Sequence, residues 1–217
     1  MRRFREDDAE DVVEIFSQWG LVRNEEERRK QLGRLRKIAA LQSGREDAEV
    51  GGPEWYDHYL VAELDGKVVG RVILEAAYPP YSEIINLYVH TDYTGRGIGS
   101  SLVKRCVEIA SAHRCFVTSV MTDPVGNLPA HRLYSKFGFR PGILGDPTAK
   151  RGHMWLLRFS GESCVSEFIR RHPFGEPSVS QSKVSFHGRT LYRMAWRDPQ
   201  TAGRGSRMNS KESERSV

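Results

Sequence analysis

The stretch that decides the fold is residues 84–99, IINLYVHTDYTGRGIG, in which an apolar run leads into a turn with three glycines. A helical pattern follows directly from Ser100. A helix N-terminus carries unpaired N–H groups and a partial positive charge, and both attract phosphate. Glycines also let the backbone approach an anion closely, because they lack a Cβ atom. The residues expected to contact a phosphorylated cofactor are Gly95, Arg96, Gly97, Ile98, Gly99 and Ser100.

The glycines alone do not identify that cofactor. A P-loop requires Gly-Lys-Ser/Thr at its end, and no lysine follows Gly99, which excludes this class. The dinucleotide fingerprint G-x-G-x-x-G would need glycine where the chain has Ser100, although Asp123 lies near the expected acidic position about 20 residues on. An ordinary glycine-rich turn that opens a helix is a third alternative.

A second motif follows at residues 127–139, NLPAHRLYSKFGF. The two motifs together resemble the GNAT acetyltransferase superfamily, which combines Gln/Arg-x-x-Gly-x-Gly/Ala with a later helix of pattern Asn-x-x-Ala-x-x-x-Tyr-x-x-x-Gly-Phe. Every fixed position of the helix pattern is met, and Gly97 and Gly99 occupy the small-residue positions of the first motif. Thr94 stands where the family has Gln or Arg, so one side-chain phosphate contact is lost and Arg96 compensates only in part.

The resemblance covers residues 1–160 and implies an α/β fold with a mixed, mostly antiparallel central sheet flanked by helices. It further implies that the strands before and after the glycine helix splay apart, and that the pantetheine arm of acetyl-CoA inserts between them. The pantetheine amides would then pair with the backbone of Leu87, Tyr88 and Val89. Asn127 could bond to the pantetheine or cap its own helix.

The resemblance also suggests the catalytic residues. Tyr134 matches the family tyrosine that protonates the departing thiolate, and a phenol with a reference pKa near 10 stays protonated at neutral pH. Glu83 lies at the offset from position 94 at which the histone acetyltransferase branch has its catalytic glutamate. Alternatives for the general base are Glu75, Asp123, His90 or a chain of water molecules.

The reaction implied is direct transfer of an acetyl group from acetyl-CoA to the primary amine of a small molecule or protein. The sequence contains no G-x-S-x-G motif and no cysteine paired with a motif histidine, so nothing in it indicates a covalent enzyme intermediate. Two other hypotheses stay open: an acetyl-CoA-binding sensor or scaffold with little catalysis, and nicotinamide-dependent redox chemistry. The acceptor cannot be read from fold and cofactor motifs.

Composition is that of a globular protein, with 217 residues, 39% hydrophobic and 28% charged. No apolar run approaches the ~20 residues of a membrane span, and the N-terminus turns acidic where a signal peptide turns apolar, so a cytoplasmic location without a membrane partner is expected. Three cysteines without C-x-x-C spacing argue against disulfides and zinc, and no metal is expected. The net charge of +5 is spread over solvated segments, notably residues 23–37, which suits anionic coenzyme A better than nucleic acid.

The chain divides into an acetyltransferase domain over 1–160, a helix and β-hairpin over 161–197, and a disordered tail over 198–217. The extension could lengthen the sheet, cover the substrate cleft or form a homodimer contact. Within the domain the expected elements are a strand at 1–5, helices at 9–18 and 24–41, a hairpin of 58–64 and 67–77, a strand at 83–90, a helix at 97–113, a strand at 115–122, a helix at 129–137, and strands starting at 138 and 153.

Overall fold

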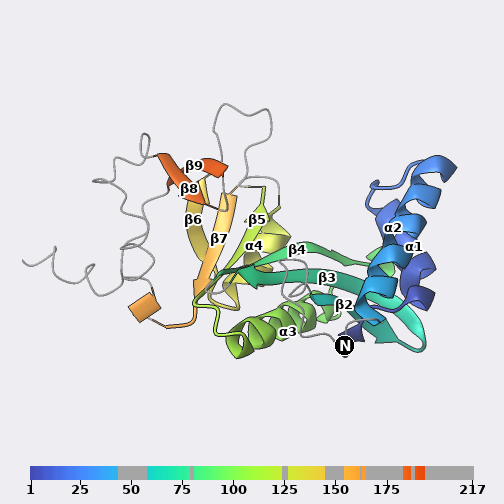
Figure 1. Ribbon diagram of the computed structural model, residues 1–217, viewed down its shortest axis with the longest axis horizontal. Coiled ribbons are helices and arrows are strands. Elements are labelled where there is room, and N and C mark those ends of the chain that lie inside the picture. The colour runs from blue at the N-terminus through green and yellow to red at the C-terminus, as the bar shows by residue number, and fades with distance from the viewer. Residues whose placement is uncertain are drawn as a thin grey trace, which may run out of the picture.

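The structure, a computed structural model, describes residues 1–43, 58–78, 81–123, 127–144, 154–161, 163–164, 183–186 and 189–193. The N-terminal elements are β1 (Arg2–Arg3), a short 3-10 helix η1 (Glu6–Asp8), α1 (Ala9–Gln18), α2 (Glu25–Ser43), β2 (His58–Leu64), β3 (Lys67–Tyr78) and β4 (Tyr81–Val89). The remaining elements are η3 (Thr91–Tyr93), α3 (Ile98–Ala112), β5 (Val117–Thr122), α4 (Leu128–Ser135), β6 (Arg140–Leu144), β7 (Met154–Phe159), β8 (Lys183–Phe186) and β9 (Arg189–Arg193). Figure 1 shows their arrangement.

The nine strands form one sheet in the order β1-β2-β3-β4-β5-β7-β6-β9-β8. Every neighbouring pair is antiparallel except β4 and β5, which run parallel. Helices pack against this sheet, so the predicted mixed, mostly antiparallel sheet flanked by helices is confirmed (Figure 1). The β8–β9 hairpin lengthens the sheet by pairing β9 with β6. The predicted helix at the start of the 161–197 extension lies largely outside the described residues, and the tail at 198–217 lies wholly outside them.

The sheet divides between β4 and β5. These strands pair only from Tyr81 opposite Val117 to Ile84 opposite Val120, whereas β4 continues to Val89. We call the opening that begins after Ile84 and Val120 the split (Figure 1). The predicted separation of the two strands is therefore confirmed.

Helix α3 lies against one face of β3 and β4. Gly70 in β3 makes this close approach possible, since a Cβ atom there would lie only 2.9 Å from Cγ2 of Ile98. The buried face of α3, which includes Leu102 and Cys106, packs against Val72 and its neighbours in the main core cluster. Helices α1 and α2 form a second cluster with Val61 and Val68, which includes Phe16 and, partly buried, Tyr88. The inner strands of this half of the sheet thus carry helices on both faces.

A β-bulge shifts the side-chain alternation of β4. Arg71 in β3 pairs with Tyr88, but Ile73 pairs with Ile85, so two residues of β4 oppose one residue of β3. Asn86, one of those two, has a φ of 54°, a left-handed conformation that asparagine tolerates better than most residues. Because paired residues share a face, Ile85 and Tyr88 both face the α1–α2 side with Arg71 and Ile73.

Candidate active site

The predicted phosphate loop joins β4 to α3. Gly95 and Gly97 have φ values of 75° and 81°, which favour glycine, and Gly97 is the N-cap of α3. Within the described part of the chain, the backbone N–H groups of residues 95–100 donate no hydrogen bond, and the first to pair is that of Ser101, which reaches the Gly97 carbonyl at 3.0 Å. This N-terminus therefore presents a set of free donors for an anion.

Close packing holds the loop in place. A Cβ atom on Gly99 would lie 3.3 Å from Cδ2 of Leu133 in α4, so the start of α3 is wedged against that helix. The Thr94 hydroxyl donates to the Thr91 carbonyl at 2.9 Å, and this contact engages the hydroxyl within the loop. The exposed Arg96 guanidinium lies 5.0 Å from the centroid of the Tyr93 ring, a cation–π contact that leaves its N–H groups available.

Tyr134 lies in α4, next in sequence to Leu133, which packs against the start of α3. The tyrosine side chain is 5% exposed, packs edge-on against Phe139, and belongs to the same buried cluster as Ile84 and Val120, the last pair before the strands part. Burial raises the pKa of the phenol above its ordinary value, with smaller contributions from Cys106 and Tyr88. Its hydroxyl bonds to no residue of the described chain, so a protonated donor remains available there.

Glu83 lies on the opposite face of the sheet, one residue before the split. It is half-buried, pairs with Glu75 of β3 and Ser119 of β5, and accepts a hydrogen bond from the Trp155 indole N–H at 3.4 Å. Desolvation raises the pKa of the neighbouring Glu75 carboxyl, even though that side chain remains exposed. Two carboxyl groups therefore face the α1–α2 side next to the split.

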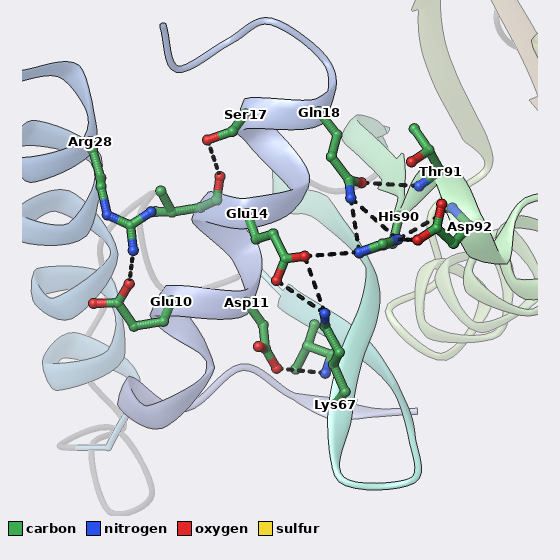
Figure 2. Close-up of polar contacts among 12 residues, drawn as sticks. Glu10, Asp11, Glu14, Ser17, Gln18, Arg28, Lys67, His90, Thr91 and Asp92 are labelled. Atoms are coloured by element: carbon green, nitrogen blue, oxygen red, sulfur yellow. Dashed lines mark hydrogen bonds and ion pairs between the residues drawn. The ribbon is translucent and has the colours of Figure 1, made fainter. Parts of the chain in front are cut away.

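His90, an alternative general base, is held in a polar network instead of facing open space. Its ring is 3% exposed, and Nε2 lies 3.1 Å from Oε1 of Glu14 and 2.9 Å from the amide nitrogen of Gln18 (Figure 2). Nδ1 accepts from the Asp92 N–H at 3.3 Å. The Lys67 ammonium is 3.0 Å from the other Glu14 oxygen, and hydrogen bonds from Lys67 and then His90 lower the pKa of Glu14.

Glu14 and Gln18 were not predicted as site residues. Gln18 also accepts from the Thr91 N–H at 3.0 Å, so α1 holds the segment that leads into the phosphate loop (Figure 2). Their only sequence signal is a spacing of i, i+4 on one helix, which is too common to indicate a role. We assign His90 to this positioning network.

The remaining predicted residues connect the end of β5 to α4. Asn127 is the N-cap of α4, and its Oδ1 accepts from the Ala130 N–H at 3.3 Å, so the capping alternative is present in the structure. His131 Nε2 lies 2.8 Å from the Asp123 carbonyl oxygen and ties the two elements together. Asp123 follows β5, at the far end of the strand from its pairing with β4.

Two of the three cysteines, Cys106 and Cys115, have the properties of core residues. Cys106 is fully buried, and this burial raises the pKa of its thiol to about 12; burial also raises the pKa of Cys115. A thiol is a weak nucleophile until it loses its proton. Within the described ranges, no three His, Cys, Asp or Glu side chains group to hold a metal ion, and no helix is long and apolar enough to cross a membrane.

Comparisons with curated proteins match part of the chain. A Bacillus subtilis protein named as an alanine N-acetyltransferase of ribosomal protein bS18 is 33% identical over 91 residues, 40% of this chain and 56% of that protein. N-acetylaspartate synthetase of Rattus norvegicus is 35% identical over 83 residues, 38% of this chain and 27% of the synthetase. The chain thus spans about half or less of the length of these curated relatives.

Solved structures share the fold over a longer span. The PaiA N-acetyltransferase from Thermoplasma acidophilum, in complex with coenzyme A, superposes with a TM-score of 0.52 at 18% identity, over 73% of this chain and 96% of that one. The sequence profile described as the Acetyltransferase (GNAT) family matches residues 22–139, more than half of the chain. From the phosphate loop, the split and these matches together, the chain belongs to the GNAT acetyltransferase family.

Proposed function

We propose that this protein transfers the acetyl group of acetyl-CoA to a primary amine of a small molecule or protein by direct attack. The observation that carries the proposal is the split itself, together with the free N–H groups at the start of α3 and the buried phenol of Tyr134. Both curated relatives described above are named for N-acetyl transfer, and the Thermoplasma neighbour holds coenzyme A.

The donor would bind along the split with its phosphates at residues 94–100. Its pantetheine arm would run beside Leu87, Tyr88 and Val89, where β4 has no partner on the β5 side. The His90 N–H donates to Val69 of β3, so the Val89 carbonyl in the same planar peptide points away from β3, toward the split. This carbonyl accepts from the Trp19 indole at 2.9 Å and has a second lone pair for a pantetheine amide. A contact from Asn127 would be additional to its capping role.

The chemistry needs a free amine and a protonated leaving group. The amine nitrogen attacks the thioester carbon, a backbone N–H of β4 stabilises the oxyanion, and the nitrogen loses a proton to Glu83, directly or through water. The C–S bond then breaks, the new C–N amide bond remains, and the thiolate takes the proton of the Tyr134 hydroxyl. The raised pKa of Tyr134 supports this role, because the phenol stays protonated at neutral pH.

Acid and base on opposite faces of the sheet suit this reaction. Tyr134 belongs to the α3 side of the split, whereas Glu83 faces the α1–α2 side. An amine that arrives from the α1–α2 side would thus meet its base there, while the sulfur leaves toward the α3 side. The same arrangement keeps the two proton transfers apart.

The proposal is tested with the full chain, acetyl-CoA and a broad panel of amines and peptides. Thiol release and the mass of the product are measured together, and calorimetry reports coenzyme A binding. Release of thiol with acetylated product supports the proposal. Tight coenzyme A binding without turnover on any acceptor would instead identify a sensor or scaffold, and no binding at all would reject the cofactor assignment.

A further inference from the structure

A cavity of about 240 Å³ lies between the α1–α2 layer and the sheet. Its wall comes from α1, α2, the segment that joins them, and strands β2, β3 and β4; its polar lining residues are Gln31, Arg34, Tyr59, Arg71, Asn86 and Tyr88. None of the described lining residues is acidic, and two are arginines. We call it the arginine cavity.

Arg71 is a buried cation that has no counter-ion among the described residues. Its side chain is 6% exposed, and its guanidinium lies 4.9 Å from the centroid of the Phe16 ring. It makes no hydrogen bond or ion pair with any residue of the described chain. Desolvation lowers its pKa to about 10, with Tyr59 and Tyr88 acting to raise it and Arg34 contributing least to lower it, so the guanidinium still carries its charge at neutral pH. A buried, unpaired charge is costly, which makes this guanidinium a strong site for an anion.

The arginine cavity adjoins the expected acetyl position. Tyr88 lines the cavity with its side chain, pairs with Arg71 across the sheet, and belongs to the backbone segment expected to hold the pantetheine. Asn86 of the bulge also lines the cavity and is exposed, so the cavity reaches the surface beside the split. Glu83 lies on the same face of β4 as Ile85. It precedes Ile85 by two residues, so the two positions are about 7 Å apart along the strand.

We propose that the arginine cavity binds the carboxylate of an acceptor amine of amino-acid size, with Arg71 as the main anion-binding residue. This inference rests on the proposed acetyl transfer and names its substrate class. The planar guanidinium fork matches a carboxylate through two parallel hydrogen bonds. Arg34 is exposed, so Arg71 is the buried arginine of this lining; its single charge is balanced by one carboxylate, whereas a phosphate would bring nearly two negative charges. The volume is below the roughly 300–1,000 Å³ of pockets for drug-sized ligands, which favours a small acceptor.

The test compares each amino acid with the amine that lacks its carboxylate, such as leucine with 3-methylbutylamine and phenylalanine with phenethylamine. Phosphoethanolamine is included as an amine that carries a phosphate in place of the carboxylate. We expect kcat/KM to be at least about tenfold higher for the carboxylate member of a pair, mainly through KM. Equal values within the pairs, or a preference for phosphoethanolamine, would overturn the carboxylate assignment while leaving acetyl transfer intact.

Variants of Arg71 assign the effect to the cavity. Arg71→Met should raise KM for the amino acid at least about tenfold, leave the decarboxylated amine and coenzyme A affinity unchanged, and not lower the melting temperature. The KM of Arg71→Lys for the amino acid should lie between the values for wild type and Arg71→Met. The matched control is Arg29→Met, which removes the same charge from an exposed site on α2 outside the cavity and should behave as wild type. Identical values for Arg71→Met and Arg29→Met would overturn the assignment.

Binding measured without turnover separates this inference from the proposed function. Calorimetry of the amino-acid panel on coenzyme A-loaded protein should show heat for wild type and none for Arg71→Met. If no acceptor were acetylated, such heat would still support the carboxylate site, and its absence would reject it. Should Arg71→Met fail to fold, Arg71→Lys and Arg34→Met carry the comparison.

Discussion

The two sides of the split differ in which part of the protein, backbone or side chains, would contact the ligand. On the α3 side, the features that would hold the donor are backbone N–H groups, glycines with positive φ, and one buried phenol. On the α1–α2 side, side chains carry the charge: Glu83 near the split, Arg71 in its cavity, and the Glu14–His90 pair behind the loop. A backbone surface suits a ligand that never changes, whereas a side-chain surface can be altered residue by residue.

The largest expected effect tests the buried phenol on the donor side. Tyr134→Phe keeps the ring and its packing but removes the proton, so kcat should fall by roughly 10²–10⁴ with little change in coenzyme A affinity. Because burial raises the pKa of this phenol, wild-type activity should not decline through its ionisation as pH rises to 10. Tyr192→Phe, which removes a phenol hydroxyl from β9, is the control. Full turnover in Tyr134→Phe would assign the ring a structural role only.

The next effect tests the backbone itself. Valine at position 97 cannot easily adopt a φ of 81°, so the loop must move its N–H groups and coenzyme A affinity should weaken by about 10²-fold. Gly99→Val should act similarly through its contact with Leu133. Gly66→Val is matched in strain, with a φ of 79° in the β2–β3 turn, and should cost stability but not affinity. Unchanged calorimetric affinity in Gly97→Val would refute the phosphate-loop assignment.

A smaller loss is expected on the acceptor side. Glu83→Gln should lower the rate about tenfold to a hundredfold near pH 6 and progressively less as pH approaches the amine pKa of about 9. Water can take over part of the proton transfer, which keeps this loss below that of Tyr134→Phe. Glu75→Gln separates the two neighbouring carboxylates in the same pH–rate measurement. If Glu75→Gln lowered the rate on the acidic side of the pH profile and Glu83→Gln did not, the base would be Glu75.

The smallest effect concerns the support behind the loop. The pKa of Glu14 is lowered in the folded protein, so its contribution to stability is present above its unfolded value and is lost as pH falls through the lowered value. Since this carboxylate is nearly half exposed, we expect Glu14→Gln to cost only about 0.5 kcal/mol at pH 7, or 1–2 °C in melting temperature. The difference from wild type should shrink as pH falls below the usual carboxyl pKa of about 4. A constant difference across pH would mean that packing, not charge, is lost.

Prediction from sequence was most successful where the backbone conformation determines which residue a position can hold. The loop that begins α3 is visible as glycines at fixed spacing, since the positive φ of Gly95 and Gly97 restricts residue choice; its phosphate binding stays a prediction. The split and Tyr134 followed from the resemblance that these motifs carry. The acceptor side offered no such signal, because its groups converge only in the folded chain: His90 and Glu14 are 76 positions apart, and Arg71 reads as one more arginine in a strand. The bulge at Asn86 was invisible too, since one asparagine in an apolar run does not reveal a positive φ.

That bulge acts on β4 as a one-residue insertion acts on a reading frame. Before it, odd-numbered positions such as Glu83 and Ile85 face the acceptor side; after it, the even-numbered Tyr88 does. If β4 were straightened without losing a residue, the ring of Tyr88 would turn into the α3 core and Leu87 would turn toward Arg71. Deletion of Asn86 would instead remove the bulge and leave Leu87 and Tyr88 on their present sides, so the extra residue keeps the two sides of the split in place only as long as the bulge absorbs it.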